Sequence, residues 1–366
     1  MNIYLDNIVF SIQQAGGVSA YWYELLKGIC NSGQRVSFLN TRLTADNVFE
    51  QQLQYNDYPC IRESKLPAGL LRYLPLRYTL PAGAIYHAGY MRVSPQKNIL
   101  NILTVHDFAH ERKLATRFPR GLFNTTQKAY GIRKADGIIC ISESTRSELY
   151  HFYPQARAAS VSVIHHGIGS DFSVMDKRSW PSVLAKKNIP AYVLYVGARN
   201  YYKHFNTAVQ ALALLPENYH LVAVGGGATS ATENALLKKL LPGRHHLLPV
   251  VSKETLNHLY NQAFCLLYPS VYEGFGFPPG EAMKAGCPVV ACNRTSIPEV
   301  VGDAGILADE PLPEVFAFRI QELEQDSYRQ RLISKGLARV QQFTWEKTVA
   351  STLHFYQNCW QKKFAR

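Results

Sequence analysis

Two glutamates, Glu273 and Glu281, stand eight positions apart across a run of glycines, prolines and aromatic residues. Glu273 follows an expected apolar strand over 263–268, and Glu281 lies at the start of an expected short helix over 280–285. Loops that leave the carboxyl end of a strand and enter a helix are where open α/β sheets bind phosphorylated ligands. The segment therefore predicts a nucleotide-sugar site. Between the carboxylates, the backbone of Gly274, Phe275 and Gly276 is bare enough to line a sugar.

Glu281 can accept two hydrogen bonds from vicinal hydroxyls such as those of a ribose. The alternative is that both carboxylates are helix-start charges that favour the macrodipole. That alternative explains Glu281 but not Glu273, so the functional interpretation is favoured.

Two cations four positions apart, Arg199 and Lys203, follow Gly197 at the end of an expected strand over 191–196. At this position they can clamp a diphosphate and neutralise the charge that builds as a sugar leaves. A solvated pair on a loop is the alternative. The sequence has no Asp-x-Asp and no His/Cys cluster at ligand spacing. We therefore expect no metal, so that helix dipoles, Arg and Lys must neutralise any bound diphosphate.

In the first half, Gly16 and Gly17 lie between an expected strand over 3–10 and a helix over 18–30. Glycines there let backbone N–H groups approach an anion at the helix N-terminus, although tight turns also use them. His106 ends an apolar strand beside Asp107, where it can reach a ligand or serve a structural role. No G-x-G-x-x-G fingerprint is present, which disfavours a dinucleotide oxidoreductase.

The elements that must position these residues alternate between strand and helix, which predicts an α/β fold with parallel sheets. The length of 366 residues suits two domains. We expect an N-terminal Rossmann-like domain over 1–170, a linker over 171–185 and a C-terminal Rossmann-like domain over 186–344, with a last helix over about 345–366 returning to the first domain. Expected strands are 3–10, 36–38, 84–87, 99–106, 137–142, 160–165, 191–196, 219–224, 246–249, 263–268, 288–292 and 305–307, and further expected helices are 123–134 and 144–152.

The formal charge of +12 is concentrated in one segment, 62–134, which holds thirteen Lys or Arg against three acids. Part of it interleaves Lys65, Arg72 and Arg77 with Leu and Tyr, a mixture that suits an anionic membrane surface, where each basic residue contributes about 1 kcal/mol. A solvated face is the ordinary alternative. Nucleic acid is disfavoured because no recognised binding module accompanies the charge. The seven cysteines are scattered without a Cys-x-x-Cys pair, and no signal peptide or membrane-spanning run is evident. These features predict a cytoplasmic protein.

The second half resembles the retaining glycosyltransferases of family 4, which have the two-domain GT-B architecture. The resemblance covers nearly all of 191–309 and is thinner in the first half. Its motifs are Tyr195-Val196-Gly197 with Arg199 and Lys203, Val222 to Gly225, Leu256 to Tyr260, Tyr268-Pro269-Ser270, Glu273 to Gly276, Glu281-Ala282-Met283, Gly286 to Val290, Ile297 to Val300, and in the first half Gly16-Gly17, Val105-His106-Asp107, Ser142-Glu143-Ser144, Arg146 and His166-Gly167-Ile168.

The resemblance implies that the C-terminal domain holds a nucleotide-diphosphate sugar, that the N-terminal domain holds the acceptor, and that chemistry occurs in the cleft between them. It assigns Glu281 to the ribose, Glu273 to the donor sugar and His106 to a sugar contact. It assigns the diphosphate to Arg199 and Lys203, although many members space these cations by five. It assigns Gly17 to the acceptor or phosphate. The departing phosphate would take the acceptor proton and the donor's α-configuration would be retained.

The resemblance implies a hexose as the donor sugar, with GDP-mannose as first candidate. It also implies a glycan or polyprenyl-diphosphate-linked acceptor of a bacterial O-antigen, capsule or lipopolysaccharide. The expected location is cytoplasmic. Peripheral attachment to the inner face of the cytoplasmic membrane is the second option. Two alternatives stay open: a nucleotide-sugar 2-epimerase of the same architecture, which converts donor without acceptor, and a non-catalytic nucleotide-sugar binder.

Overall fold

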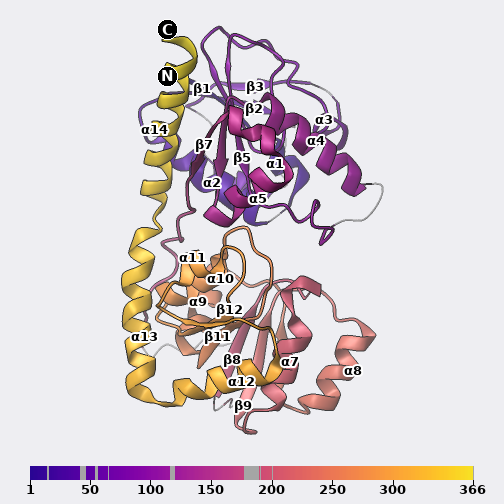
Figure 1. Ribbon diagram of the computed structural model, residues 1–366, viewed down its shortest axis with the longest axis vertical. Coiled ribbons are helices and arrows are strands. Elements are labelled where there is room, and N and C mark those ends of the chain that lie inside the picture. The colour runs from indigo at the N-terminus through magenta and orange to yellow at the C-terminus, as the bar shows by residue number, and fades with distance from the viewer. Residues whose placement is uncertain are drawn as a thin grey trace. The chain divides into compact units, whose positions relative to one another are not determined.

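The computed structural model describes residues 1–14, 16–41, 47–53, 57–64, 66–115, 120–176, 189, 191–199 and 201–365. The chain forms two compact units (Figure 1). Unit 1 comprises residues 1–167 with 345–366, and unit 2 comprises residues 168–344. Each unit has a parallel sheet with helices on both faces, so the expected α/β fold class is confirmed.

The sheet of unit 1 is parallel throughout its described pairings and has the order β3-β2-β1-β4-β5-β6-β7. Its strands are β1 (Asn2–Asp6), β2 (Arg35–Asn40), β3 (Cys60–Arg62), β4 (Ile85–Ala88), β5 (Leu100–Val105), β6 (Gly137–Cys140) and β7 (Ser160–Val163). Its helices are α1 (Ile8–Ile12), α2 (Gly17–Cys30), α3 (Ala68–Leu71), α4 (Arg120–Lys134), α5 (Glu143–Phe152) and α14 (Trp345–Phe364).

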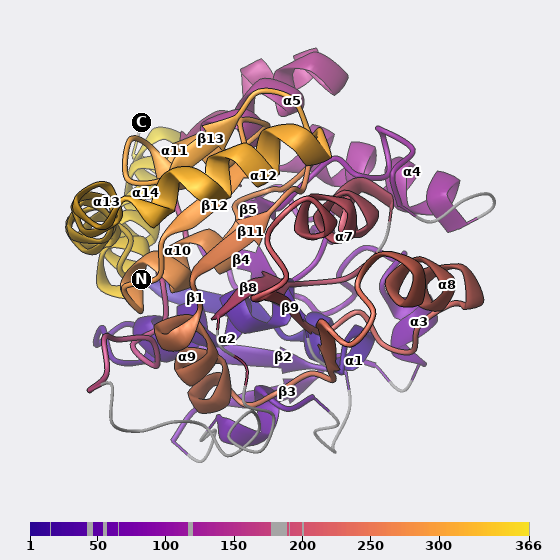
Figure 2. The same ribbon diagram turned by 90° about the horizontal axis from the view of Figure 1, so that it is seen from below.

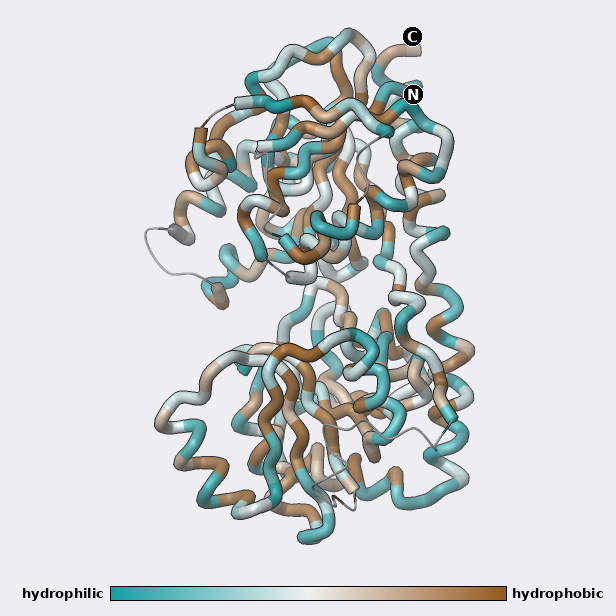
Figure 3. The backbone as a smooth tube through the Cα atoms, turned by 180° about the vertical axis from the view of Figure 1, so that it is seen from behind, coloured by the Kyte–Doolittle hydropathy of each residue, from teal (hydrophilic) through white to brown (hydrophobic). Residues whose placement is uncertain are grey.

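Alternating side chains of these strands face two different helix layers, as the period of two in a strand requires. Ile102 and Ile139 pack with α2 and α14, whereas Leu103 and Ile138 pack under α4 and α5. Figure 3 shows the hydrophobic colour concentrated along the strands of the sheets. Both faces are buried, which explains the nearly continuous apolar runs that predicted the strands.

The sheet of unit 2 is parallel in the same way and has the order β10-β9-β8-β11-β12-β13. Its strands are β8 (Ala191–Val196), β9 (Tyr219–Val224), β10 (His245–Leu248), β11 (Cys265–Tyr268), β12 (Val289–Cys292) and β13 (Ile306–Ala308). Its helices are α7 (Phe205–Ala213), α8 (Ala231–Leu240), α9 (Lys253–Gln262), α10 (Phe277–Lys284), α11 (Ile297–Val301), α12 (Pro313–Gln321) and α13 (Asp326–Arg339). Figure 2 shows this sheet with α7, α8 and α12 on one side and α9 and α10 on the other.

Several expected boundaries differ from the observed ones by one to three residues, and two further differences have a clear physical cause. The first strand ends at Asp6, and the chain then forms α1, because the Asp6 carboxylate accepts the Ile8 N–H at 3.0 Å and starts a helical turn. The helix expected over 280–285 begins at Phe277, because prolines are tolerated in the first turn, where no backbone donor is required. Glu281 therefore lies in the second turn, beyond the part of the helix where the macrodipole acts.

The expected linker over 171–185 is described only up to Asp176. Asp171 pairs with Lys253 of α9, and the N–H groups of Ser173 and Met175 donate to side chains of the same helix. This part of the segment packs as part of unit 2, and residues 177–185 lie outside the described residues.

In each sheet the strand order reverses at one place, between β1 and β4 in unit 1 and between β8 and β11 in unit 2. Open α/β sheets bind ligands beyond the carboxyl ends of the strands at such a switch point. The two switch points are therefore the first places to look for a site.

Candidate functional site

At the switch point of unit 2, Lys203 and Glu273 form an ion pair. Lys203 ends a short 3₁₀ helix after β8, and Glu273 lies in the loop after β11. The Tyr268 hydroxyl donates to the same carboxylate oxygen, Oε1. The side chains of Lys203 and Glu273 are 16% and 12% exposed, so the pair is largely shielded but still reachable. Two predicted site residues that are seventy positions apart thus meet where a ligand is expected.

Ser296 holds the loop that carries Glu273. Its hydroxyl donates to the Glu273 and Phe275 carbonyls at 2.9 Å each. The Glu273 N–H donates to the Thr295 hydroxyl at 3.0 Å. Gly276 adopts a left-handed conformation, φ 102°, and caps α10. The backbone from Glu273 to Gly276 is therefore rigid, with Gly274 between two fixed residues.

The Phe275 side chain does not line an open site, because it is 3% exposed and packs edge-on against Phe277 and Phe343. The contact with the donor that was predicted for the Phe275 backbone stays a prediction. The ring serves instead to anchor the loop to the core of unit 2.

Arg199 does not take part in the Lys203–Glu273 pair and has hydrogen-bond partners of its own. Its guanidinium donates to the Gly225 and Gly227 carbonyls at 2.5 and 2.7 Å and to Glu233 at 3.2 Å, and its side chain is 3% exposed. A solvated pair of cations is therefore the wrong description of Arg199 and Lys203, because each is paired with a different carboxylate. Arg199 holds the loop after β9.

Glycines are required where the loops after β8 and β9 approach each other. Gly197 and Gly225 both have positive φ, and a Cβ on Gly225 would lie 3.2 Å from the Gly197 carbonyl oxygen. A Cβ on Gly226 would lie 2.6 Å from the Arg199 guanidinium. A hollow of about 460 Å³ borders this region. Its lining includes Arg199, Tyr201, His204, Ser230 and Glu233.

Glu281 forms a second and separate pair, because Tyr260 of α9 donates its hydroxyl to Glu281 Oε2 at 3.0 Å. Burial raises the pKa of Glu281 to about 7, an effect that the Tyr260 hydrogen bond and the charge of Lys253 oppose. The carboxyl is thus poised between its neutral and charged forms near neutral pH. A hydroxyl donor on the ligand would favour the charged form.

In unit 1, His106 follows β5 and contacts the rings of Tyr21 and His166, with centroids 5.0 and 5.7 Å away. Burial is the main cause that lowers the pKa of His106 to about 4, with Lys128 adding to it and Asp107 opposing it. His106 is therefore a neutral imidazole at physiological pH, suited to hydrogen bonding rather than to charge neutralisation.

Gly17 is exposed in the first turn of α2, and Tyr21 stands one helical turn further on the same face. Because Tyr21 contacts His106, the structure brings the helix start and the histidine to one place. The Tyr21 hydroxyl is 3.2 Å from that of Thr104, which is 2.9 Å from His87 Nε2.

The switch point of unit 1 is filled by its own side chains. Arg92 pairs with Asp6 at 2.8 Å and with Glu63 at 2.7 Å, and all three side chains are 0% exposed. Tyr86 donates to Asp6 at 2.6 Å, and a Cβ on Gly89 would lie 2.8 Å from the Asp6 carbonyl. Among the described residues, this end of the sheet in unit 1 is thus occupied by a buried ion-pair cluster, whereas the Lys203–Glu273 pair of unit 2 is partly exposed.

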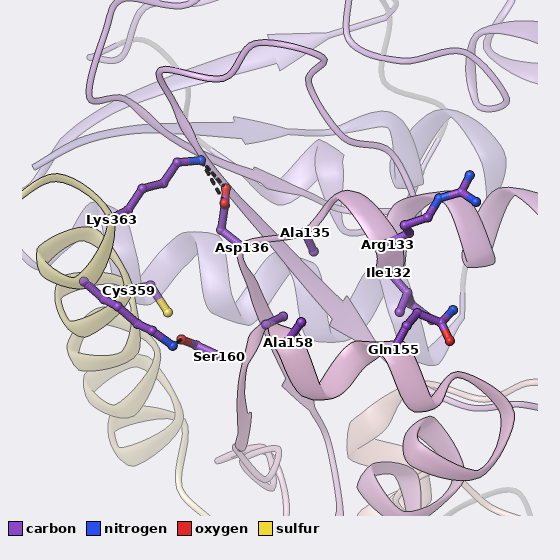
Figure 4. A pocket seen from close by; sticks show the side chains of 11 residues that line it. Ile132, Arg133, Ala135, Asp136, Gln155, Ala158, Ser160, Cys359 and Lys363 are labelled. Carbon is purple, nitrogen blue, oxygen red and sulfur yellow. Dashed lines mark hydrogen bonds and ion pairs between the residues drawn. The ribbon is translucent and has the colours of Figure 1, made fainter.

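A further hollow, of about 260 Å³, lies at the amino ends of β6 and β7 in unit 1 (Figure 4). Lys363 of α14 bonds both carboxylate oxygens of Asp136 at 2.8 Å there, and Asp136 also accepts the Asn101 N–H. This arrangement anchors α14 to the sheet, at the edge opposite to the one where α/β sheets bind ligands.

Within the described part of the chain, no group of His, Cys, Asp or Glu side chains is arranged to hold a metal ion. Among the same residues, no helix is both long and apolar enough to cross a membrane.

The residues that hold the predicted ones in place had no role predicted from the sequence. Tyr268 is the last residue of β11 and Tyr260 lies on α9, and both lay in the quoted motifs without an assigned role. Ser296 follows β12, and its position at a strand's carboxyl end was the available signal. Nothing in the sequence spacing of Asp6, Glu63 and Arg92 indicated that these residues form a cluster.

Comparison with known proteins gives two family matches. The family described as Glycosyltransferase Family 4 matches residues 15–172, and the one described as Glycosyl transferases group 1 matches residues 176–339. O-antigen chain mannosyltransferase B of Escherichia coli is 34% identical over 231 residues, which is 60% of this chain and 60% of that protein. The serotype-specific mannosyltransferase WbdA of Escherichia coli is 26% identical over 227 residues, 59% of this chain and 28% of WbdA. The chain thus spans 60% or less of the length of these relatives.

Two solved structures share the architecture over nearly the whole chain. Sucrose-phosphate synthase from Thermosynechococcus elongatus has a TM-score of 0.77 at 21% identity, covering 99% of this chain and 100% of that one. HepE from Anabaena in complex with UDP-glucose has a TM-score of 0.73 at 17% identity, covering 97% and 99%. These likenesses show the GT-B fold. Because the two family matches together cover most of the sequence, the chain belongs to glycosyltransferase family 4, the glycosyl transferases group 1.

Proposed function

We propose that the protein is a retaining glycosyltransferase that moves a hexose from a nucleotide-diphosphate sugar to a glycan or polyprenyl-diphosphate-linked oligosaccharide. GDP-mannose is the first candidate donor, because the similar curated proteins are named mannosyltransferases. Their names also support a role in O-antigen or related surface polysaccharide synthesis.

One observation carries the proposal: Lys203, Glu273 and Tyr268 form a shielded polar cluster at the switch point of unit 2. Unit 1 fills its own switch point with Asp6, Arg92 and Glu63. This difference supports a nucleotide in unit 2 and an acceptor at unit 1, where Gly17 would approach the acceptor or phosphate and His106 would contact a sugar.

Lys203 would stabilise the leaving diphosphate. An ammonium has three donors, so its bond to Glu273 leaves two for phosphate oxygens. Arg199 would add positive charge near the diphosphate while it holds the loop at Gly225 and Gly227. Gly197 and Gly274 would allow backbone groups to approach the ligand. No metal enters this proposal, because Lys203, Arg199 and the helix ends supply the positive charge.

Glu273 would position the donor sugar rather than attack it, because its Oε1 already accepts from Lys203 and Tyr268. With no protein nucleophile, the acceptor hydroxyl would approach from the face that the diphosphate leaves, and the phosphate would take its proton. Neutral His106 would donate a hydrogen bond to a sugar hydroxyl, and Glu281 would accept from the ribose.

The test is product formation from GDP-mannose with a mannose-containing glycan acceptor, followed by chromatography. We expect acceptor-dependent transfer with α-linkage. UDP-, dTDP- and CDP-sugars are run in parallel to identify the donor. Conversion of donor in the absence of any acceptor would contradict the proposal and indicate an isomerase.

A further inference from the structure

The hollow of about 460 Å³ in unit 2 lies on the side of the sheet that α7 and α8 cover, where these two helices are neighbours (Figure 2). Its described lining residues come from the loop after β8, the first turn of α7 and the start of α8. Lys203, Glu273 and Glu281, to which the donor is assigned, are not among them. Sites for small molecules usually have volumes of about 300–1,000 Å³, so the hollow is large enough for a ligand of its own.

The most buried part of the lining is electrically balanced. The Arg199 side chain is 3% exposed, and its guanidinium lies 5.6 Å from the centre of the Phe205 ring and 3.2 Å from the Glu233 carboxylate. Burial lowers the pKa of His204 below its ordinary value, so its imidazole is neutral at neutral pH. Because the charges of Arg199 and Glu233 offset each other, the described lining favours an uncharged ligand over a phosphate.

The outer part of the lining carries hydroxyl and amide groups. Asn206, Ser230 and Thr232 are exposed, and the hydroxyls of Ser230 and Thr232 are 3.0 Å apart. Amide and hydroxyl side chains supply both donors and acceptors. The hollow therefore suits a ligand whose edge is rich in hydroxyl groups.

Tyr201 borders the same hollow with a ring that is 88% exposed, the largest exposed fraction among the large apolar side chains that the structure describes. It is the first residue of the short 3₁₀ helix that ends at Lys203, and its ring centre is 6.2 Å from that of His204. A hexose ring presents C–H groups on its faces and hydroxyls at its edge. A free aromatic face beside neutral polar groups matches both parts of such a ring.

We infer that this hollow is a second carbohydrate site, in which a hexose unit of a glycan stacks on Tyr201 and hydrogen-bonds to Asn206 and Thr232. The inference rests on the proposed function in one respect, that the protein handles a glycan. The bound unit belongs to the acceptor or product and is distinct from the transferred hexose, because Lys203 and Glu273 lie outside the lining.

The test is hydrogen–deuterium exchange of the full chain, read by mass spectrometry with and without α-linked mannotetraose. We expect the tetrasaccharide to slow exchange in segments 201–207 and 230–233. Tyr201→Ala should abolish this protection and weaken calorimetric affinity for mannotetraose at this site about tenfold or more, whereas Tyr201→Phe should keep both because the ring remains. The matched control is Phe318→Ala, which removes a 59% exposed ring from α12 and should change neither.

Unchanged protection in Tyr201→Ala, or an equal loss in Phe318→Ala, would overturn the inference. Displacement of mannotetraose from segment 230–233 by GDP would also overturn it, because the hollow would then belong to the nucleotide site. Transfer from GDP-mannose is measured separately. A native chain that shows the protection but transfers nothing counts against the proposed function alone, and a chain that transfers without the protection counts against this inference alone.

Discussion

The ammonium of Lys203 is paired with the carboxylate of Glu273, and the pair joins the loop after β8 to the loop after β11. Tyr268 donates to the same oxygen, so the carboxylate is held from two sides. This arrangement holds a cation at the switch point of unit 2, and the proposed function would use such a preorganised cation to stabilise developing charge.

Lys203→Ala should lower turnover about 100-fold or more at saturating donor, the scale of losing one charge-stabilising donor. The measurement is steady-state mannosyl transfer. A suitable control is Lys335→Ala, which removes the surface pair between Lys335 and Asp303 and should leave turnover unchanged. Native turnover in Lys203→Ala would remove this residue from the chemistry.

Arg199→Ala should lower turnover by a similar factor of about 100 or more, and Arg199→Lys should recover little of it. A lysine cannot donate to Gly225, Gly227 and Glu233 in the fork that the guanidinium forms. Turnover and limited proteolysis of both variants check this. Full turnover in Arg199→Lys would show that charge alone matters and that the loop needs no support.

Nucleotide affinity should rise about five- to tenfold between about pH 6 and pH 8, because Glu281 loses its proton near pH 7 and a carboxylate accepts more strongly than a carboxylic acid. Glu281→Gln should remove this pH dependence and weaken the affinity at high pH. Tyr260→Phe should move the midpoint to higher pH, because the lost hydrogen bond had opposed the rise in pKa. Calorimetry with GDP provides the measurement, and undiminished affinity in Glu281→Gln would remove this residue from the ribose.

Local patterns in the sequence predicted the alternation of strands and helices, the parallel sheets and the loops that carry Glu273 and Lys203. They could not predict that these two residues pair, because strand order brings β8 beside β11 only in the folded sheet. The first strand was predicted too long because Asp6 starts a helix through its side chain, an effect that apolar periodicity does not record. The burial of Phe275 and of Arg199 likewise depends on partners distant in sequence.

Arg92→Met should lower the free energy of unfolding by about 3–5 kcal/mol, because it leaves the buried carboxylates of Asp6 and Glu63 without their partner. Lys253→Ala, which removes an exposed pair with Asp171, should cost at most about 1 kcal/mol. Denaturant unfolding compares the two variants. Similar small losses in both would contradict the interpretation of the filled switch point.

The central claim is that unit 2 binds a nucleoside diphosphate sugar through Lys203 without a metal ion. Calorimetric titration of GDP-mannose into the native chain and into Lys203→Ala, both in excess EDTA, tests it most directly. We expect saturable binding by the native chain in EDTA and an affinity about tenfold or more lower in the variant. Binding that appears only with magnesium or manganese, or equal affinity in both proteins, would contradict it.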